Sequence, residues 1–230
     1  MTILQTPAPQ TVPADALAKA GRLAGAAWFL LLAFLCAWRI PAQLTALPRW
    51  PPTFAQSAPI LSSVCTLAFF MILAWLMLAR PAAVARDVRL APRIVSLAGT
   101  YGAWTVAFLP QAQLSPALTL AAASITLAGG MLTIYTVVQL GRSFSISPQA
   151  RALITTGPYA LVRNPLYLAE EIAIIGLAMH VVWWTAAPFL LVHIGLQVQR
   201  MTYEERVLGA AFPDYADYAR RTARLIPGVW

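Results

Sequence analysis

Six strongly apolar segments, separated by prolines and charged residues, decide what this chain can fold into. They cover residues 25–40, 59–79, 94–109, 116–140, 166–181 and 183–198. Because a bilayer interior offers the backbone no water, such segments are stable there as helices. A full crossing needs about 20 residues, so several segments are marginal. We expect an all-α integral membrane bundle with five to six transmembrane helices, in which the last two segments cross fully or form a tight helical hairpin.

The distribution of basic residues along the chain agrees with six membrane crossings. Sixty per cent of the 230 residues are hydrophobic and 10% are charged, which excludes an ordinary soluble domain. With six crossings, 14 of the 16 basic residues share one side, and Arg39 and Arg49 are the exceptions. The positive-inside rule makes that side, with both termini, cytoplasmic. One lysine against fifteen arginines, with abundant alanine, indicates a GC-rich genome, so we expect a bacterial inner membrane.

A polar turn punctuated by prolines precedes the last two apolar segments. It reads TTGPYALVRNPLY at residues 155–167. Pro158 and Pro165 restrict the backbone on either side of the turn. Pro165 suits the first turn of a helix, with Asn164 as its N-cap. The free N–H groups at that helix end, beside Arg163, predict a site for a carboxylate or phosphate.

A second polar stretch, RMTYEERVLGAAFPDYADYARRTARLIPG at residues 200–228, follows the hairpin. Both stretches should lie on one side of the membrane, where they can close over one ligand. Arg200 and Glu204 are four residues apart on one helix face, and Tyr159 and Tyr167 add aromatic surfaces. This set suits a zwitterionic, base-bearing cofactor beside a lipophilic substrate from the bilayer. The plainer alternatives are an interfacial aromatic belt and an exposed helix pair.

Two adjacent carboxylates lie inside an apolar segment, where they are costly. Glu170 and Glu171 either lie at headgroup level, paired with Arg142 or Arg163, or line a ligand pocket. Membrane lipids are expected partners because basic loops attract anionic headgroups.

Other conspicuous residues receive no separate function. His180 and His193 have no third ligand nearby, and Cys36 and Cys65 read as small core residues, so we expect no metal. The Gly129–Gly130 pair predicts close helix packing or a kink. No nucleic-acid-binding pattern is present, and we expect no nucleic acid partner.

The two polar stretches together resemble the isoprenylcysteine carboxyl methyltransferase family and its phospholipid methyltransferase relatives. The resemblance rests on TTGPYALVRNPLY and on the later EE, FPDY, DY and LIP elements, and covers about residues 139–228. It implies a membrane enzyme that uses S-adenosylmethionine, bound in a cytosol-facing pocket closed by cytosolic C-terminal helices. With the hydropathy pattern, it predicts a cytosolic N-terminal tail at 1–23, a four-helix membrane region at 24–140 and a cofactor-binding catalytic region at 141–230.

The resemblance also assigns site residues position by position. The implied cofactor-binding residues are Arg151, Ala152, Leu153, Ile154, Tyr159, Arg163, Asn164, Pro165, Leu166, Tyr167 and Glu204. Asn164 stands where histidine is commonest in the family, and an amide cannot act as a base near neutral pH. Arg200 aligns with the arginine that orients the substrate carboxylate. Arg200 and Glu204 are therefore the expected catalytic residues, and Arg200 and Glu171 the expected substrate-binding residues.

The predicted function is methyl transfer from S-adenosylmethionine to a lipophilic acceptor, most simply a carboxylate such as an isoprenylcysteine or another lipid acid. A carboxylate is already ionised, so it needs positioning and desolvation rather than a base. An amine or hydroxyl acceptor would need Glu171 or Glu204 as a base. Two alternatives remain: a nicotinamide-dependent membrane reductase of the sterol-reductase type, and a non-catalytic membrane protein that retains the scaffold.

Overall fold

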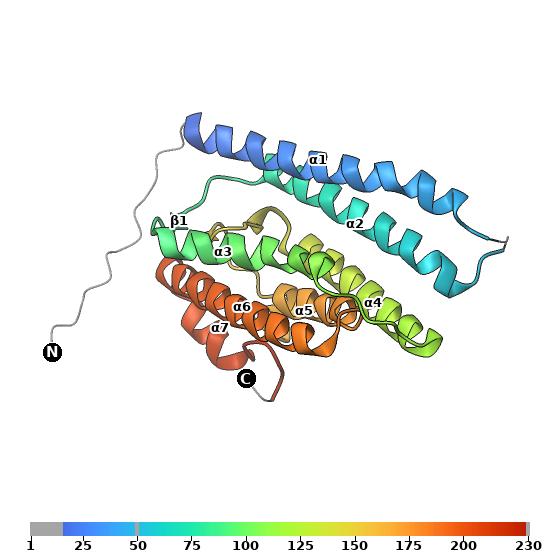
Figure 1. The fold of residues 1–230 in the computed structure, drawn as a ribbon. Coiled ribbons are helices and arrows are strands. Elements are labelled where there is room, and N and C mark those ends of the chain that lie inside the picture. Colours follow the sequence, from blue (N-terminus) through green and yellow to red (C-terminus); the bar gives the residue numbers. More distant parts are fainter. Residues whose placement is uncertain (1–15, 49–50, 229–230) are drawn as a thin grey trace.

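Helices form nearly all of the regular structure in the computed structural model, which describes residues 16–48 and 51–228 (Figure 1). The α-helices are α1 (Ala16–Thr45), α2 (Phe54–Ala79), α3 (Leu90–Gly102), α4 (Pro116–Leu140), α5 (Pro165–Ala178), α6 (Trp183–Ala211) and α7 (Tyr215–Arg221). The short elements are β1 (Ala85–Arg86), β2 (Gln149–Ala150) and the 3₁₀ turns η1 (Ala103–Phe108), η2 (Gly141–Ser143) and η3 (Gly157–Ala160). The predicted all-α membrane bundle is confirmed.

Each apolar segment is helical, although the helices often extend past it. Helix α4 has the predicted limits, but α1 begins at Ala16, inside the predicted tail, because the sequence there is rich in alanine. Helix α6 continues past the apolar part to Ala211. Residues 1–15 of the predicted tail, and Arg49, lie outside the described residues.

Three helices are long and apolar enough to cross a membrane within the described ranges. These candidate spans are Lys19–Thr45, Gln56–Ala79 and Pro116–Ser143. Helices α3 and α5 have 13 and 14 residues. At about 1.5 Å per residue they cover about 20 Å, less than the roughly 30 Å of a bilayer core. The spans fit an integral membrane protein, while the number of full crossings stays a prediction.

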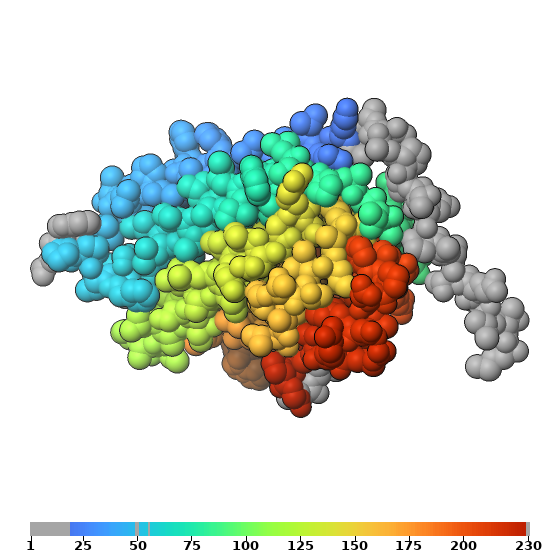
Figure 2. Space-filling view, turned by 180° about the vertical axis from the view of Figure 1, so that it is seen from behind, coloured from blue at the N-terminus to red at the C-terminus, as the bar shows by residue number. Residues whose placement is uncertain are grey.

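The helices pack in two groups. Helices α1, α2, α4 and α5 pack against one another in that order, and α3 packs along α6. From behind, α4 runs as a yellow-green band between α2 and α5 (Figure 2). Aromatic contacts join the two groups, since the Trp28 ring lies edge-on to Tyr101 at 6.1 Å and Phe70 edge-on to Trp104 at 6.4 Å.

Small residues allow α4 and α5 to touch closely. A Cβ atom on Gly129 would lie 2.3 Å from the backbone nitrogen of Ala173, and one on Gly176 would lie 2.4 Å from the Thr126 hydroxyl. Such contacts let backbones approach in membrane helices. The predicted packing role of the glycine pair therefore belongs to Gly129, since nothing lies within 4 Å of a Cβ on Gly130.

The α2–α3 and α4–α5 connections lie together at one end of the bundle. Strand β1, between α2 and α3, pairs antiparallel with β2, between α4 and α5, in the register Ala85↔Ala150. The C-terminal part of α6 contacts both strands. Figure 1 shows this end, with the start of α1 and α7, on the left. The loops predicted to be basic and cytoplasmic thus lie together.

Large apolar side chains are exposed along the outer helices. Phe34 and Trp38 on α1 and Trp75 on α2 are 60%, 75% and 61% exposed. Water would disfavour so large an apolar surface, whereas lipid accommodates it.

The arrangement predicts which loops can be reached from outside the cell. In a chain with Cys36 and Cys65 replaced by alanine, Val88→Cys should resist an impermeant thiol reagent in intact cells, because it lies at the basic end. Ala46→Cys, at the opposite end and also exposed, should react. Labelling of intact and lysed cells measures this, and efficient outside labelling at position 88 would contradict the orientation.

Candidate active site

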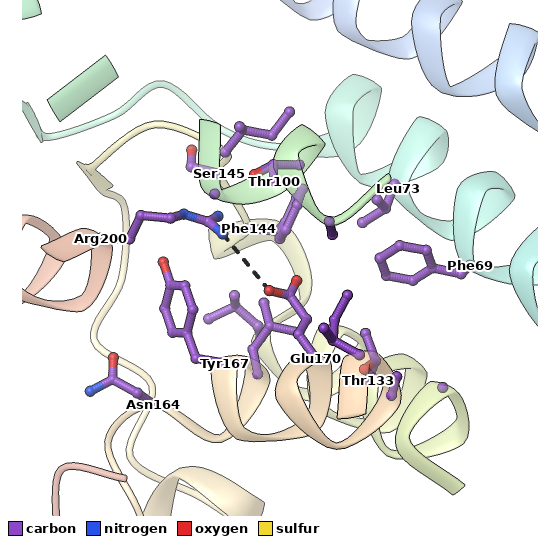
Figure 3. A pocket seen from close by; sticks show the side chains of 18 of the residues that line it. Phe69, Leu73, Thr100, Thr133, Phe144, Ser145, Asn164, Tyr167, Glu170 and Arg200 are labelled. Atoms are coloured by element: carbon purple, nitrogen blue, oxygen red, sulfur yellow. Dashed lines mark ion pairs between the residues drawn. The ribbon is translucent and has the colours of Figure 1, made fainter. Parts of the chain in front are cut away.

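A cavity of about 810 Å³ lies between the two helix groups. Side chains from α2, α3, α4, α5 and α6 line it, together with the loop at residues 143–154. Figure 3 shows Arg200 and Tyr167 at one side, Glu170 in the middle, and Phe69 and Leu73 at the other. One end of the cavity is therefore charged and the other apolar.

Arg200 supplies a buried cation at the polar end. The residue is 5% exposed, and its guanidinium carbon lies 4.9 Å from the Tyr167 ring centre. Arg200 Nη1 donates to Gln197 Oε1 at 2.6 Å, and Glu170 Oε2 is 3.8 Å from Nη1. Arg200 Nε is buried without a hydrogen-bond partner in the described part of the chain. Burial excludes the alternative of an exposed pair with Glu204.

Glu204 also borders the cavity, one turn beyond Arg200. It accepts a 2.5 Å hydrogen bond from the Tyr167 hydroxyl. Burial raises the pKa of the Glu204 carboxyl to about 7, because the attraction of Arg200 and the hydrogen bond from Tyr167 offset the lost water only in part. Glu204 therefore changes charge near neutral pH.

Tyr159 and Tyr167 are buried cavity walls rather than an interfacial belt. They are 7% and 4% exposed. The Tyr159 carbonyl accepts a 2.6 Å hydrogen bond from the Tyr218 hydroxyl, whereas the Tyr159 hydroxyl is buried and unpartnered within the described residues. Burial raises the pKa of the Tyr159 phenol well above its usual value, so its hydroxyl remains a neutral donor.

The loop before the turn contributes a mixed wall. Arg151, Ala152, Leu153 and Ile154 line the cavity, as does Leu166 of α5. The Arg151 guanidinium already donates to the Pro81 carbonyl at 3.0 Å, to Gln149 Oε1 at 2.6 Å and to the Ser145 hydroxyl. Burial lowers the pKa of Arg151 to about 10, which leaves it charged at neutral pH.

Arg163 and Asn164 border the cavity but hold the C-terminal segment. Arg163 donates to the Ala219 carbonyl at 2.7 Å and to the Thr222 carbonyl. The backbone N–H groups of residues 163 and 164 donate to the carbonyls of residues 223 and 224. These two N–H groups, which belong to the predicted anion site at this helix end, thus already bond to the chain itself.

Glu205 ties the same elements together. Its Oε1 accepts from Asn164 Nδ2 at 2.8 Å and lies 3.3 Å from Arg163 Nε, while Oε2 lies 3.2 Å from Arg224 Nε. Asn164 is the N-cap residue of α5, as predicted, but its side chain makes no capping hydrogen bond and turns toward Glu205 instead. Pro165 starts α5 as predicted and is buried there. It positions the helix without bordering the cavity.

The two glutamates of α5 face different partners. Glu170 borders the cavity and accepts from Gln197 Nε2 at 2.9 Å. Glu171 Oε1 lies 2.7 Å from His193 Nδ1, and it does not line the cavity. Pairing with Arg142 or Arg163 was therefore the wrong alternative. Each glutamate of α5 has a nearer partner on α6: Gln197 for Glu170 and His193 for Glu171.

The histidines also differ. His193 is 3% exposed and its Nε2 lies 3.2 Å from the Gly99 carbonyl, which links α6 to α3. His180 borders the cavity. Across residues 16–48 and 51–228, no three histidine, cysteine or acidic side chains are grouped as metal ligands.

Comparison with known proteins agrees with this geometry. Residues 117–214 match the phospholipid methyltransferase family. The matched methyltransferase domain runs from α4 to the loop before α7 and contains every predicted site residue from Arg151 to Glu204. The resemblance predicted from the two polar stretches is confirmed for this part of the chain.

Two curated bacterial proteins are similar over part of their length. The nickel-cobalt-cadmium resistance protein NccN of Alcaligenes xylosoxydans xylosoxydans is 36% identical over 102 residues, which are 43% of this chain and 48% of that protein. The cobalt-zinc-cadmium resistance protein CzcN of Cupriavidus metallidurans is 40% identical over 76 residues, 33% of this chain and 35% of that protein. The match thus spans about half or less of these relatives.

Sequence reasoning missed several residues around the methyltransferase domain's site. Gln197 could have been found, because polar residues at 193, 197, 200 and 204 repeat every three or four positions and so share one helix face. Glu205 was hidden beside Glu204 in the EE pair. Gly99, Phe69 and Leu73 meet the site through tertiary packing, for which the sequence carries no local signal.

The Glu205 network predicts a local change in stability. Glu205→Gln removes the charge shared by Arg163 and Arg224, at a cost of about 1–3 kcal/mol for a buried charged hydrogen bond. Hydrogen exchange at the amides of residues 163 and 164, which bond to the tail, should accelerate about tenfold or more. Asp217→Asn, which breaks an exposed pair with Arg220, is the control. Unchanged exchange at these amides would mean that the tail is held by other contacts.

Proposed function

We propose that this chain is an S-adenosylmethionine-dependent methyltransferase that acts on a lipophilic acceptor drawn from the bilayer, with a carboxylate as the favoured methyl acceptor. The carrying observation is one cavity that joins a charged end at Arg200 and Glu204 to an apolar end at Phe69 and Leu73. Such a cavity suits a polar cofactor beside a lipid chain, and residues 117–214 match a methyltransferase family.

Unpartnered polar atoms support a bound cofactor at the polar end. The hydroxyls of Tyr159 and Tyr215 are buried without partners among the described residues, and both residues line the cavity. Buried donors normally have partners, so these hydroxyls are suited to a ligand. Glu170, Glu204 and Glu205 line the cavity together with Arg151, Arg163 and Arg200, so the site offers both signs of charge to a ligand that carries a sulfonium and a carboxylate. S-adenosylmethionine, when bound, would supply an electrophilic methyl group on a positively charged sulfur.

Different residues would hold different parts of that cofactor. Glu204 and Tyr159 offer a carboxylate and a phenol, and residues 151–154 and Leu166 offer an apolar and backbone surface. Arg151 and Arg163 would favour the cofactor's carboxylate through their charge alone, because their N–H groups already bond to protein acceptors. The resemblance implied that these two arginines contact the cofactor directly; we propose instead that they attract its carboxylate by charge.

Arg200 would orient the acceptor. A guanidinium can bind a carboxylate with two parallel hydrogen bonds, and Arg200 Nε is without a protein partner in the described residues. The acceptor's chain would lie along the apolar wall of α2. Because a carboxylate is already ionised, the protein's work is to position it and exclude water. Glu171 is an unsuitable base for an amine or hydroxyl acceptor, since it does not itself line the cavity and is paired with His193.

A nicotinamide-dependent reductase is the weaker candidate. Its cofactor carries several phosphates, and Arg151 and Arg163, which could attract them, already donate to protein acceptors. A non-catalytic scaffold would have no use for unpartnered buried hydroxyls. Titration of the detergent-purified chain with S-adenosylmethionine and with NADPH separates the three possibilities. We also propose that the polar end faces the cytoplasm of a bacterial inner membrane, with both termini on that side.

Loss of the Tyr167–Glu204 pair should weaken cofactor binding. Glu204→Ala and Tyr167→Ala should each cost about 1–3 kcal/mol of S-adenosylmethionine affinity, the scale for a lost buried polar partner. Calorimetry measures this, and Tyr135→Ala on the exposed side of α4 is the matched control. Two variants with wild-type affinity would remove the proposed site.

Cofactor affinity should also depend on pH through Glu204. Its carboxyl has a raised pKa of about 7, so it is mostly neutral below that pH and negative above it. The wild-type affinity for the cationic cofactor should therefore rise between about pH 6 and about pH 8 relative to Glu204→Gln. The difference between the two profiles removes the titration of the cofactor's own amino group. Parallel profiles would show that Glu204 does not face the cofactor's charge.

Arg200→Lys should separate acceptor handling from cofactor binding. Lysine keeps the charge but lacks the planar fork, so methyl transfer to a lipophilic acid should fall about tenfold or more, equivalent to about 1.4 kcal/mol of lost positioning. S-adenosylmethionine affinity should stay near that of the wild type. Arg206→Lys, exposed on the same helix, is the control. A parallel fall in affinity and turnover would assign Arg200 to the cofactor instead.

A further inference from the structure

Gln197 lies between the two charged side chains that meet at the polar end of the cavity. It is 1% exposed and sits one helical turn before Arg200. Its Oε1 accepts from Arg200 Nη1 at 2.6 Å, and its Nε2 donates to Glu170 Oε2 at 2.9 Å. The partners fix the orientation of this amide, because a guanidinium can only donate and a carboxylate can only accept.

The amide keeps Arg200 and Glu170 apart. They form a loose ion pair whose closest atoms are 3.8 Å from each other (Figure 3), whereas a direct charge-assisted hydrogen bond is about 2.7–2.9 Å long. A buried cation that loses a hydrogen-bond partner turns toward the nearest carboxylate. Without the Gln197 amide, that carboxylate is Glu170. The guanidinium would then bond directly to Glu170 and would no longer be available to a ligand.

Gly99 leaves the space for this arrangement. A Cβ atom at Gly99 would lie 2.5 Å from Arg200 Cδ and 3.2 Å from Gln197 Oε1. The Gly99 carbonyl lies 3.2 Å from His193 Nε2, and the other ring nitrogen lies 2.7 Å from Glu171. The buried pair of Glu171 and His193 thus holds α3 against α6 where Arg200 passes.

We propose that Gln197 is a positioning residue, which holds the Arg200 guanidinium away from Glu170 and so keeps it free for the anionic headgroup of a lipophilic acid. The proposal rests on the proposed function, since it concerns the acceptor of that same site. Gln197 and Glu170 compete for the Arg200 guanidinium, and this competition would determine the selectivity for a charged over a neutral headgroup. Tyr167 and Glu204 also face Arg200, and they are unchanged in the variants below.

The test compares a lipophilic acid with its neutral analogue. Equilibrium binding of laurate and of dodecanol is measured on the detergent-purified full chain, at one pH and one detergent concentration, without cofactor. Gln197→Met keeps the side-chain volume but removes the amide, so the preference for laurate should fall about tenfold, the change that corresponds to about 1.4 kcal/mol. Gln199→Met, on the exposed face of the same helix, is the matched control.

A second substitution tests the mechanism. Glu170→Gln added to Gln197→Met removes the competing carboxylate, so the preference for laurate should return to within about threefold of the wild type. A merely structural defect at position 197 would not be rescued in this way. Loss of preference without rescue, or an unchanged preference in Gln197→Met, would overturn the proposal.

S-adenosylmethionine titrations on the same samples distinguish the two levels of inference. Wild-type protein that prefers laurate and shows the rescue, yet binds no S-adenosylmethionine, would reject the proposed methyltransferase while supporting the role of Gln197. Wild-type protein that binds S-adenosylmethionine but shows no preference for laurate would reject the role of Gln197 and leave the methyltransferase standing.

Discussion

A cation buried between membrane helices must be matched by acceptors on its neighbours, and this requirement at Arg200 organises the site. Each acceptor comes from a different turn or helix: Gln197 from α6, Glu170 and the Tyr167 ring from α5. The helix that supplies no acceptor, α3, contributes a glycine where the arginine stem crosses it. Because charges are costly away from water, these contacts fix the spacing of α3, α5 and α6 around the polar end of the cavity.

The matched domain and the cavity do not have the same limits. Residues 117–214 carry Arg200 and Glu204, but Phe69 and Leu73 on α2, Gly99 on α3 and Tyr215 on α7 line the cavity from outside that range. Under the proposed function, the transfer chemistry and the shape of the acceptor pocket would therefore depend on different parts of the chain.

Hydropathy was enough to predict the helices, because a bilayer leaves the backbone no other state. The polar stretches likewise predicted that Arg200, Glu204, Tyr159 and Tyr167 meet at one cavity. The partners of each residue were beyond the sequence. Asn164 occupies the predicted N-cap position of α5, yet its side chain bonds to Glu205, a residue 41 positions away. Such choices depend on which acceptor lies nearer after packing, and local patterns contain no distances.

The last contacts of the site are made by the segment that follows α7. Residues 162 and 223 form a parallel bridge, and the carbonyls of residues 223 and 224 accept the N–H groups at the start of α5. Residues 223 and 224 are synthesised after all the described helices, since they follow α7 in the chain. The bonds between these carbonyls and residues 163 and 164 are therefore the last of these contacts that a growing chain can form.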